Sequence, residues 1–199
     1  MSRRSNFVPS GNEGGDRLAF FHILEQLKTQ RRTGWVNNRV TTSFASISDH
    51  MHRMSILALC TTDQGLDVSK CVMLSVVHDL AEAIVGDIAP SDGIPSAEKK
   101  KLEADAISSM VGDMLHGGPA ARRIEALWNE YEAGETAEAR FVKDLDRVEM
   151  ALQASEYEKR HRKDLQPFFD SSISKIQHPE VQGWAADLIT ERASRASEP

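Results

Sequence analysis

The stretch Val76-Val77-His78-Asp79-Leu80-Ala81-Glu82 sets three ionisable side chains directly after an apolar run that begins at Cys71. Burying an ionised carboxylate is costly unless a partner neutralises it. A divalent metal suits adjacent His and Asp side chains, because imidazole nitrogen and carboxylate oxygen are both common metal ligands. The stretch therefore predicts a metal site inside a helical core and favours a metal-dependent hydrolase.

The rest of the chain also has helical patterning. Leu18, Phe21, Leu24 and Leu27 recur at the three- to four-residue spacing of an amphipathic helix, which Gly34 ends. Further helices are predicted over about 49–63, 68–84, 96–116, 119–133, 136–162, 165–176 and 179–192. We therefore predict one all-α domain, a single helical bundle over residues 16–192, with disordered tails at 1–15 and 193–199.

Composition limits the partners of the protein. The chain has 199 residues and a net charge of -6, whereas nucleic-acid polymers usually bind basic surfaces. No apolar run approaches the roughly 20 residues of a membrane span. We expect a cytoplasmic protein, with a nuclear fraction as an open alternative, that binds neither nucleic-acid polymer nor membrane.

Two more residues are candidate metal ligands. His50 precedes Met54 and Leu57 by four and seven residues, so it shares their apolar helix face. Asp146 lies at the core edge of a later helix, while Asp144 is about 200° round that helix and is expected in solvent. We predict a metal site made by His50, His78, Asp79 and Asp146.

This ligand set indicates a chemistry. Two imidazoles and two carboxylates suit a divalent transition ion such as Co, Mn, Zn or Fe better than Mg. Glu82 is expected on the same helix face as His78 and Asp79, where it can manage a proton. Asp87 follows in a loop that could meet a substrate hydroxyl. Lys99-Lys100-Lys101 is interpreted as a solvated helix face, with steering of a phosphate as the alternative.

The order His50, His78-Asp79, Asp146 resembles the HD-domain metal-dependent phosphohydrolases, and longer segments resemble the HD-domain 5'-deoxynucleotidases. Those segments are Arg32-Thr33-Gly34-Trp35-Val36, Ser48-Asp49-His50-Met51, Val77-His78-Asp79-Leu80-Ala81-Glu82, Val85-Gly86-Asp87-Ile88-Ala89-Pro90, Ala137-Glu138-Ala139-Arg140-Phe141-Val142-Lys143 and Leu145-Asp146.

The resemblance implies hydrolysis of deoxyribonucleoside 5'-monophosphates to a deoxynucleoside and phosphate, by a protein that forms a homodimer. It implies that His50, His78, Asp79 and Asp146 bind the metal, and that Glu82 and Asp79 are catalytic. It implies that Trp35 and Asp87 line the nucleotide pocket. Arg32, Arg39 and Lys143 are further candidate substrate-binding residues, and which of them contacts the phosphate stays open.

Two positions depart from the pattern of these relatives: Ala45 stands where many have Glu, and Gly34 stands where some have Arg. Neither is a predicted metal ligand, so activity is still expected. The alternatives are another HD-type phosphohydrolase, acting on a cyclic nucleotide or another phosphoester, and a non-catalytic helical module.

Overall fold

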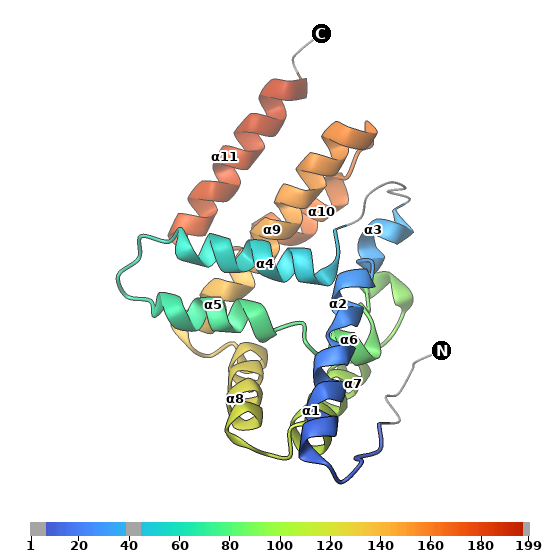
Figure 1. The fold of residues 1–199 in the computed structure, drawn as a ribbon. Coiled ribbons are helices and arrows are strands. Elements are labelled where there is room, and N and C mark those ends of the chain that lie inside the picture. Colours follow the sequence, from blue (N-terminus) through green and yellow to red (C-terminus); the bar gives the residue numbers. More distant parts are fainter. Residues whose placement is uncertain (1–6, 39–44, 197–199) are drawn as a thin grey trace. The chain divides into compact units, whose positions relative to one another are not determined.

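The regular structure of the protein is helical (Figure 1). A computed structural model describes residues 7–38 and 45–196, and within these ranges the sole β-type pairing is an isolated bridge between Arg31 and Ser46. The predicted all-α fold is thus confirmed. The elements are α1 (Glu13–Ile23), α2 (Glu25–Thr29), α3 (Thr33–Asn37), α4 (Ile47–Leu59), α5 (Val68–Val77), α6 (Glu82–Val85), the short 3-10 helix η1 (Pro90–Asp92), α7 (Ser96–Ser109), the π-helical turn η2 (Met110–Met114), α8 (Pro119–Ala133), α9 (Ala137–His161), α10 (Gln166–Ser172), the 3-10 helix η3 (Ile173–Lys175) and α11 (Pro179–Ala196).

The chain forms two compact units. The first comprises Met1–His52 and Val76–Glu132, and the second comprises Arg53–Ser75 and Ala133–Pro199. In the first unit α2 packs on α6, α6 packs on α7, and α1 packs on η2. Its core is apolar and includes Phe20, Leu27, Ile47, Leu80, Ile107, Met110, Met114 and Trp128.

The second unit is built on α9, against which α10 and α11 pack (Figure 1). Arg192 on α11 links all three helices. Its Nε donates to Glu158 on α9 at 2.7 Å, its Nη1 donates to Gln166 on α10 at 2.6 Å, and its guanidinium lies 4.2 Å from the ring centroid of Phe169. None of the helices in residues 7–38 and 45–196 has the length and apolar character needed to cross a membrane.

The terminal helices extend past the predicted boundaries at 16 and 192. Helix α1 begins at Glu13, because Asn12 Oδ1 accepts the N–H groups of Gly14 and Gly15 at 2.9 and 3.1 Å. Helix α11 continues to Ala196. The outermost parts of both predicted tails, 1–6 and 197–199, lie outside the described residues.

Helix α4, which carries His50, begins with a reciprocal cap. Ser46 Oγ accepts the N–H of Asp49 at 3.1 Å, and Asp49 Oδ2 accepts the N–H of Ser46 at 2.8 Å. This capping-box arrangement fixes the first turn of the helix. The helix therefore starts at Ile47, earlier than the predicted 49.

The predicted helix over 68–84 is interrupted near its C-terminal end. Helix α5 stops at Val77 and α6 starts at Glu82. Between them the backbone bonds span three residues instead of four: Leu80 N–H donates to Val77 at 3.2 Å, and Glu82 N–H donates to Asp79 at 3.0 Å. Side chains three residues apart eclipse in such tight turns, so Asp79 and Glu82 share one side of the chain.

Candidate metal centre

His50, His78 and Asp79 converge in the first unit. The Nε2 atoms of His50 and His78 lie 3.8 and 3.2 Å from Asp79 Oδ2. The two imidazole rings meet edge to face, with centroids 5.4 Å apart, and each offers a ring nitrogen within 4.8 Å of the other. His50 is buried, as its spacing from Met54 and Leu57 predicted.

This donor set fits a divalent metal. Each Nε2 atom is buried and lies within 4 Å of the Asp79 carboxylate oxygen. Two imidazole nitrogens and one carboxylate oxygen around a common point form the mixed nitrogen and oxygen set that transition ions accept. Tyr131 on α8 packs against His78, with ring centroids 5.0 Å apart, and limits how that imidazole can turn.

Glu82 lies in an acidic and buried environment beside this set. It is 5% exposed. Burial raises its pKa well above the ordinary 4.5, and the negative charges of Asp79 and Asp87 raise it further. The pKa of Asp79 is shifted the other way. Burial alone would raise it, but the positive charges of His78, His50 and Arg32 outweigh burial and hold it below the ordinary 3.8. Neighbouring carboxylates with pKa values pushed apart are a feature of acid–base sites.

Asp87 connects the loop after α6 to the short helix α3. Gly86 turns the chain into this loop with φ 85° and ψ 164°, a conformation nearly confined to glycine. Asp87 Oδ2 then accepts the N–H of Thr33 at 2.6 Å, and the Asp87 carbonyl accepts the Thr33 hydroxyl at 2.6 Å. Helix α3 is therefore capped by a residue from a distant part of the chain. It carries Trp35, which is 1% exposed.

Asp79, Glu82 and Asp87 form an acidic group, and the positive charge of Arg32, the residue before α3, acts on all three. It favours the ionised forms of Asp79, Glu82 and Asp87. Arg39 lies outside the described residues. Lys143 and Asp146 are on α9 in the second unit, both half-buried.

The structure contradicts the predictions that Lys99 and Asp144 are solvated. Lys99 is not simply a solvated face residue, because its Nζ donates to the Ile88 carbonyl at 3.1 Å, next to Asp87. Three consecutive lysines gave no signal as to which one turns inward. Asp144 was expected in solvent but is 2% exposed, and its Oδ2 accepts the N–H groups of Gln177 and His178 at 2.8 and 2.7 Å.

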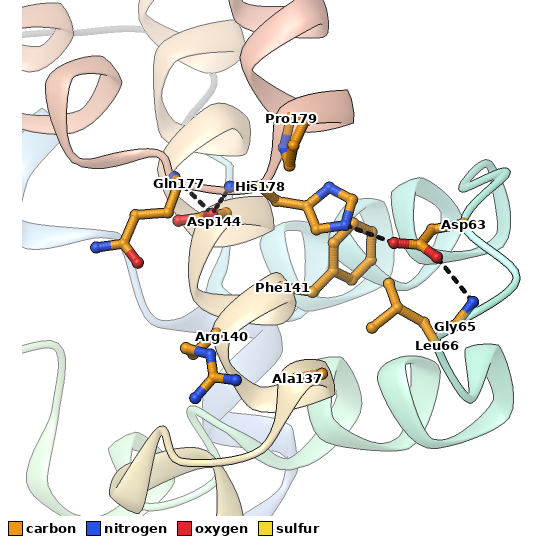
Figure 2. Close-up of a pocket in the computed structure, with 10 residues that line it drawn as sticks. All are labelled: Asp63, Gly65, Leu66, Ala137, Arg140, Phe141, Asp144, Gln177, His178 and Pro179. Carbon is orange, nitrogen blue, oxygen red and sulfur yellow. Dashed lines mark hydrogen bonds and ion pairs between the residues drawn. The ribbon is translucent and has the colours of Figure 1, made fainter.

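A separate cavity of about 420 Å³ lies within the second unit (Figure 2). Its polar walls are engaged with one another: His178 Nε2 lies 3.1 Å from Asp63 Oδ2, Asp63 Oδ1 accepts the N–H of Gly65 at 2.7 Å, and Asp144 Oδ2 on α9 accepts the N–H groups of Gln177 and His178 at 2.8 and 2.7 Å. No predicted site residue lines it. These contacts hold loop ends onto α9, which is a structural role.

Known proteins resemble the chain over nearly its whole length. A model of the HD domain family matches residues 24–186. The chain is 43% identical to human 5'-deoxynucleotidase HDDC2, covering 100% of this chain and 99% of that protein, and 39% identical to the 5'-deoxynucleotidase YGK1 of Saccharomyces cerevisiae, covering 88% and 83%.

Solved structures show the same fold. The HD domain-containing protein YGK1 has a TM-score of 0.70 at 30% identity, covering 92% of this chain and 88% of that one. The PH0347 protein from Pyrococcus horikoshii has a TM-score of 0.69 at 28% identity, covering 88% and 97%. These similarities confirm the resemblance that the His-Asp pair and its flanking motifs predicted: the chain belongs to the HD domain family.

Proposed function

We propose that this protein is a metal-dependent phosphomonoesterase that hydrolyses deoxyribonucleoside 5'-monophosphates to a deoxynucleoside and phosphate. The observation that carries the proposal is the convergence of His50 and His78 on Asp79 Oδ2 in a chain of this family. Relatives named 5'-deoxynucleotidase that match 88% or more of the chain supply the substrate class.

Asp146 is proposed as the fourth ligand, beside His50, His78 and Asp79. Arg53 follows His50 by three residues on α4, and Glu149 follows Asp146 by three residues on α9. Arg53 Nη2 pairs with Glu149 Oε1 at 2.6 Å. This ion pair joins α4 to α9 within the second unit, and the assignment of Asp146 as a ligand rests on the family resemblance.

The proposed ion is Co, Mn, Zn or Fe in preference to Mg, because nitrogen ligands suit transition ions. Such an ion, when bound, polarises a phosphoryl oxygen and acidifies water so that it becomes a nucleophile near neutral pH. The histidines and Asp79 would fix its position, and Tyr131 would fix the ring of His78.

Glu82 is proposed as the general acid–base residue. Its raised pKa lets it keep a proton at a pH at which a solvent-exposed glutamate has lost it. That proton can be donated to the 5'-oxygen as the deoxynucleoside leaves, which avoids expulsion of an alkoxide.

The nucleoside pocket is proposed around α3 and the loop after α6. Asp87 caps α3 and so fixes the helix that carries Trp35. Arg32, next to this helix, supplies positive charge for a phosphate. Arg39 and Lys143 remain proposed substrate contacts on the family resemblance alone.

Phosphate release from a panel of 5'-monophosphates tests the proposal. Protein stripped with a chelator should hydrolyse dAMP, dGMP, dCMP or TMP only after Co, Mn, Zn or Fe is restored. AMP and a 3'-monophosphate serve as controls and should be poor substrates. Release from none of the deoxynucleotides by protein with stoichiometric metal would contradict the substrate class.

The ligand assignment has its own test. His78→Ala and Asp79→Ala should lose bound metal, measured by elemental analysis, and turnover with it. His52→Ala is a matched control, because His52 is on the same helix as His50 but is exposed. Normal metal content and activity in His78→Ala would refute the assignment.

The proposal extends to assembly and location: a homodimer, as the family resemblance implies, and a cytoplasmic location, as expected from the sequence. Light scattering of the purified protein tests the first, and imaging of a tagged chain tests the second. A monomer at micromolar concentration or a membrane-bound signal would contradict these extensions without affecting the chemistry.

A further inference from the structure

Lys99 on α7 is a cation held against the acidic group of the candidate centre. Its Nζ donates to the carbonyl of Ile88 at 3.1 Å and lies 3.5 Å from Glu103 Oε1. Ile88 directly follows Asp87, so the lysine reaches the loop that caps α3. Glu103 is one helical turn after Lys99 and fixes the direction of its long side chain.

The charge on Lys99 is secured by its surroundings. Burial disfavours the ammonium, but the carboxylates of Glu103, Glu82, Asp79 and Asp87 outweigh burial and raise the pKa of Lys99 above its ordinary 10.5. Lys99 in turn favours the ionised forms of Glu82 and Asp87. It is therefore a permanent positive charge within electrostatic reach of the proposed acid–base residue.

A phosphate dianion that enters this group of carboxylates is repelled unless fixed cations compensate. An ammonium has three N–H donors, and Lys99 has two contacts within the described chain. Its side chain is 35% exposed, so a ligand can approach it. A third N–H directed at a phosphate oxygen would complete its hydrogen bonding.

We propose that Lys99, held by Ile88 and Glu103, is a phosphate-binding residue that donates to an oxygen of the substrate phosphate beside the metal centre. The inference rests on the proposed function for its substrate, but its anion chemistry can be measured separately.

The test is binding of inorganic phosphate to the metal-loaded protein by calorimetry, compared among Lys99→Met, Lys99→Arg and Lys101→Met. Lys101 is the matched control: it is on the same helix and pairs with the acidic residue four positions on, but its side chain is 71% exposed. Loss of a hydrogen bond between charged groups should raise the dissociation constant about tenfold or more in Lys99→Met. Lys101→Met should stay within about twofold of the wild type, and Lys99→Arg should recover part of the affinity.

The outcomes separate this inference from the proposed function. If the wild type hydrolyses deoxynucleotides and Lys99→Met binds phosphate as tightly as Lys101→Met, the role of Lys99 is refuted and the proposed function stands. If the wild type hydrolyses none of the panel but Lys99→Met loses phosphate affinity, the anion site stands and the substrate class is wrong.

A purely structural role for Lys99 predicts another result. Lys99→Met would then have a lower melting temperature with unchanged phosphate affinity and metal content, which also refutes the inference. Should Lys99→Met fail to fold, Lys99→Gln keeps a polar side chain, one bond shorter, and gives the same comparison without the charge.

Discussion

Arg53→Met should destabilise the protein strongly, although Arg53 itself is partly in solvent. The Nε and Nη2 atoms of Arg53 donate to Glu149 Oε1 at 2.8 and 2.6 Å, and Nη1 contacts Glu156 at 2.8 Å. Glu149 is 3% exposed and Glu156 is 51% exposed. Breaking a buried ion pair from one side typically costs about 3–5 kcal/mol, because the remaining charge is still buried.

The expected loss of stability falls just below this range, because the side chain of Arg53 is 29% exposed and water can enter when it is shortened. We expect the free energy of unfolding to fall by roughly 2–3 kcal/mol, which lowers the melting temperature by roughly 4–12 °C for a chain of this size. Glu156→Gln should lower the free energy of unfolding by less than about 1 kcal/mol, because the ion pair between Glu156 and Arg53 is exposed to solvent.

Urea unfolding followed by circular dichroism measures both values. In the double variant Arg53→Met/Glu149→Gln the buried charge is removed together with its partner, so it should be more stable than Arg53→Met alone. The reasoning is refuted if Arg53→Met lies within about 0.5 kcal/mol of the wild type, or if Glu156→Gln is as costly as Arg53→Met.

Three further predictions concern the first unit. Glu82→Gln should keep its metal and lose about 10²-fold or more in kcat, as for a lost general acid or base; an unchanged kcat in steady-state assays would remove Glu82 from the mechanism. Gly86→Ala should lower the free energy of unfolding, measured in urea, by roughly 1–3 kcal/mol, because φ is 85° and the added carbon would lie 3.0 Å from Gln30 Nε2. Gly112→Ala is the control and should be nearly neutral, because nothing lies within 4 Å of the added carbon. The backbone N–H of Ser10, and after it His116, hold the pKa of Asp16 below its ordinary 3.8. The ionised Asp16 therefore stabilises the fold above pH 3.8, and this contribution is lost as the pH falls through the lowered pKa. Asp16→Asn should weaken the fall of the melting temperature at acid pH, and an unchanged fall would contradict this.

The sequence predicted the helical class and the burial of His50, because both depend on apolar spacing. It did not predict the break between α5 and α6. No glycine or proline marks residues 78–81, and the apolar pattern runs on through them. Glu82 was expected beside Asp79 from α-helical geometry, yet it is the tighter turn that aligns the two side chains.

The sequence also failed to predict the burial and contacts of polar residues whose partners come from distant segments. Asp144 is buried because it accepts two N–H groups from residues 177 and 178, which a local helical wheel does not include. Lys99 turns toward the Ile88 carbonyl, while Lys101 on the same helix pairs with Asp105 in solvent. These are tertiary contacts, and spacing along one helix carries no information about them.

The two bonds between Thr33 and Asp87 also restrict how the sequence can change. Helix α3 has five residues, too few to form by itself, so its existence depends on a loop more than 50 positions away. Substitutions at 33 and 87 should therefore be strongly epistatic, each tolerated only in the background of a compatible partner. A designer who moves this loop into another scaffold would need to transfer residues 32–37 with it.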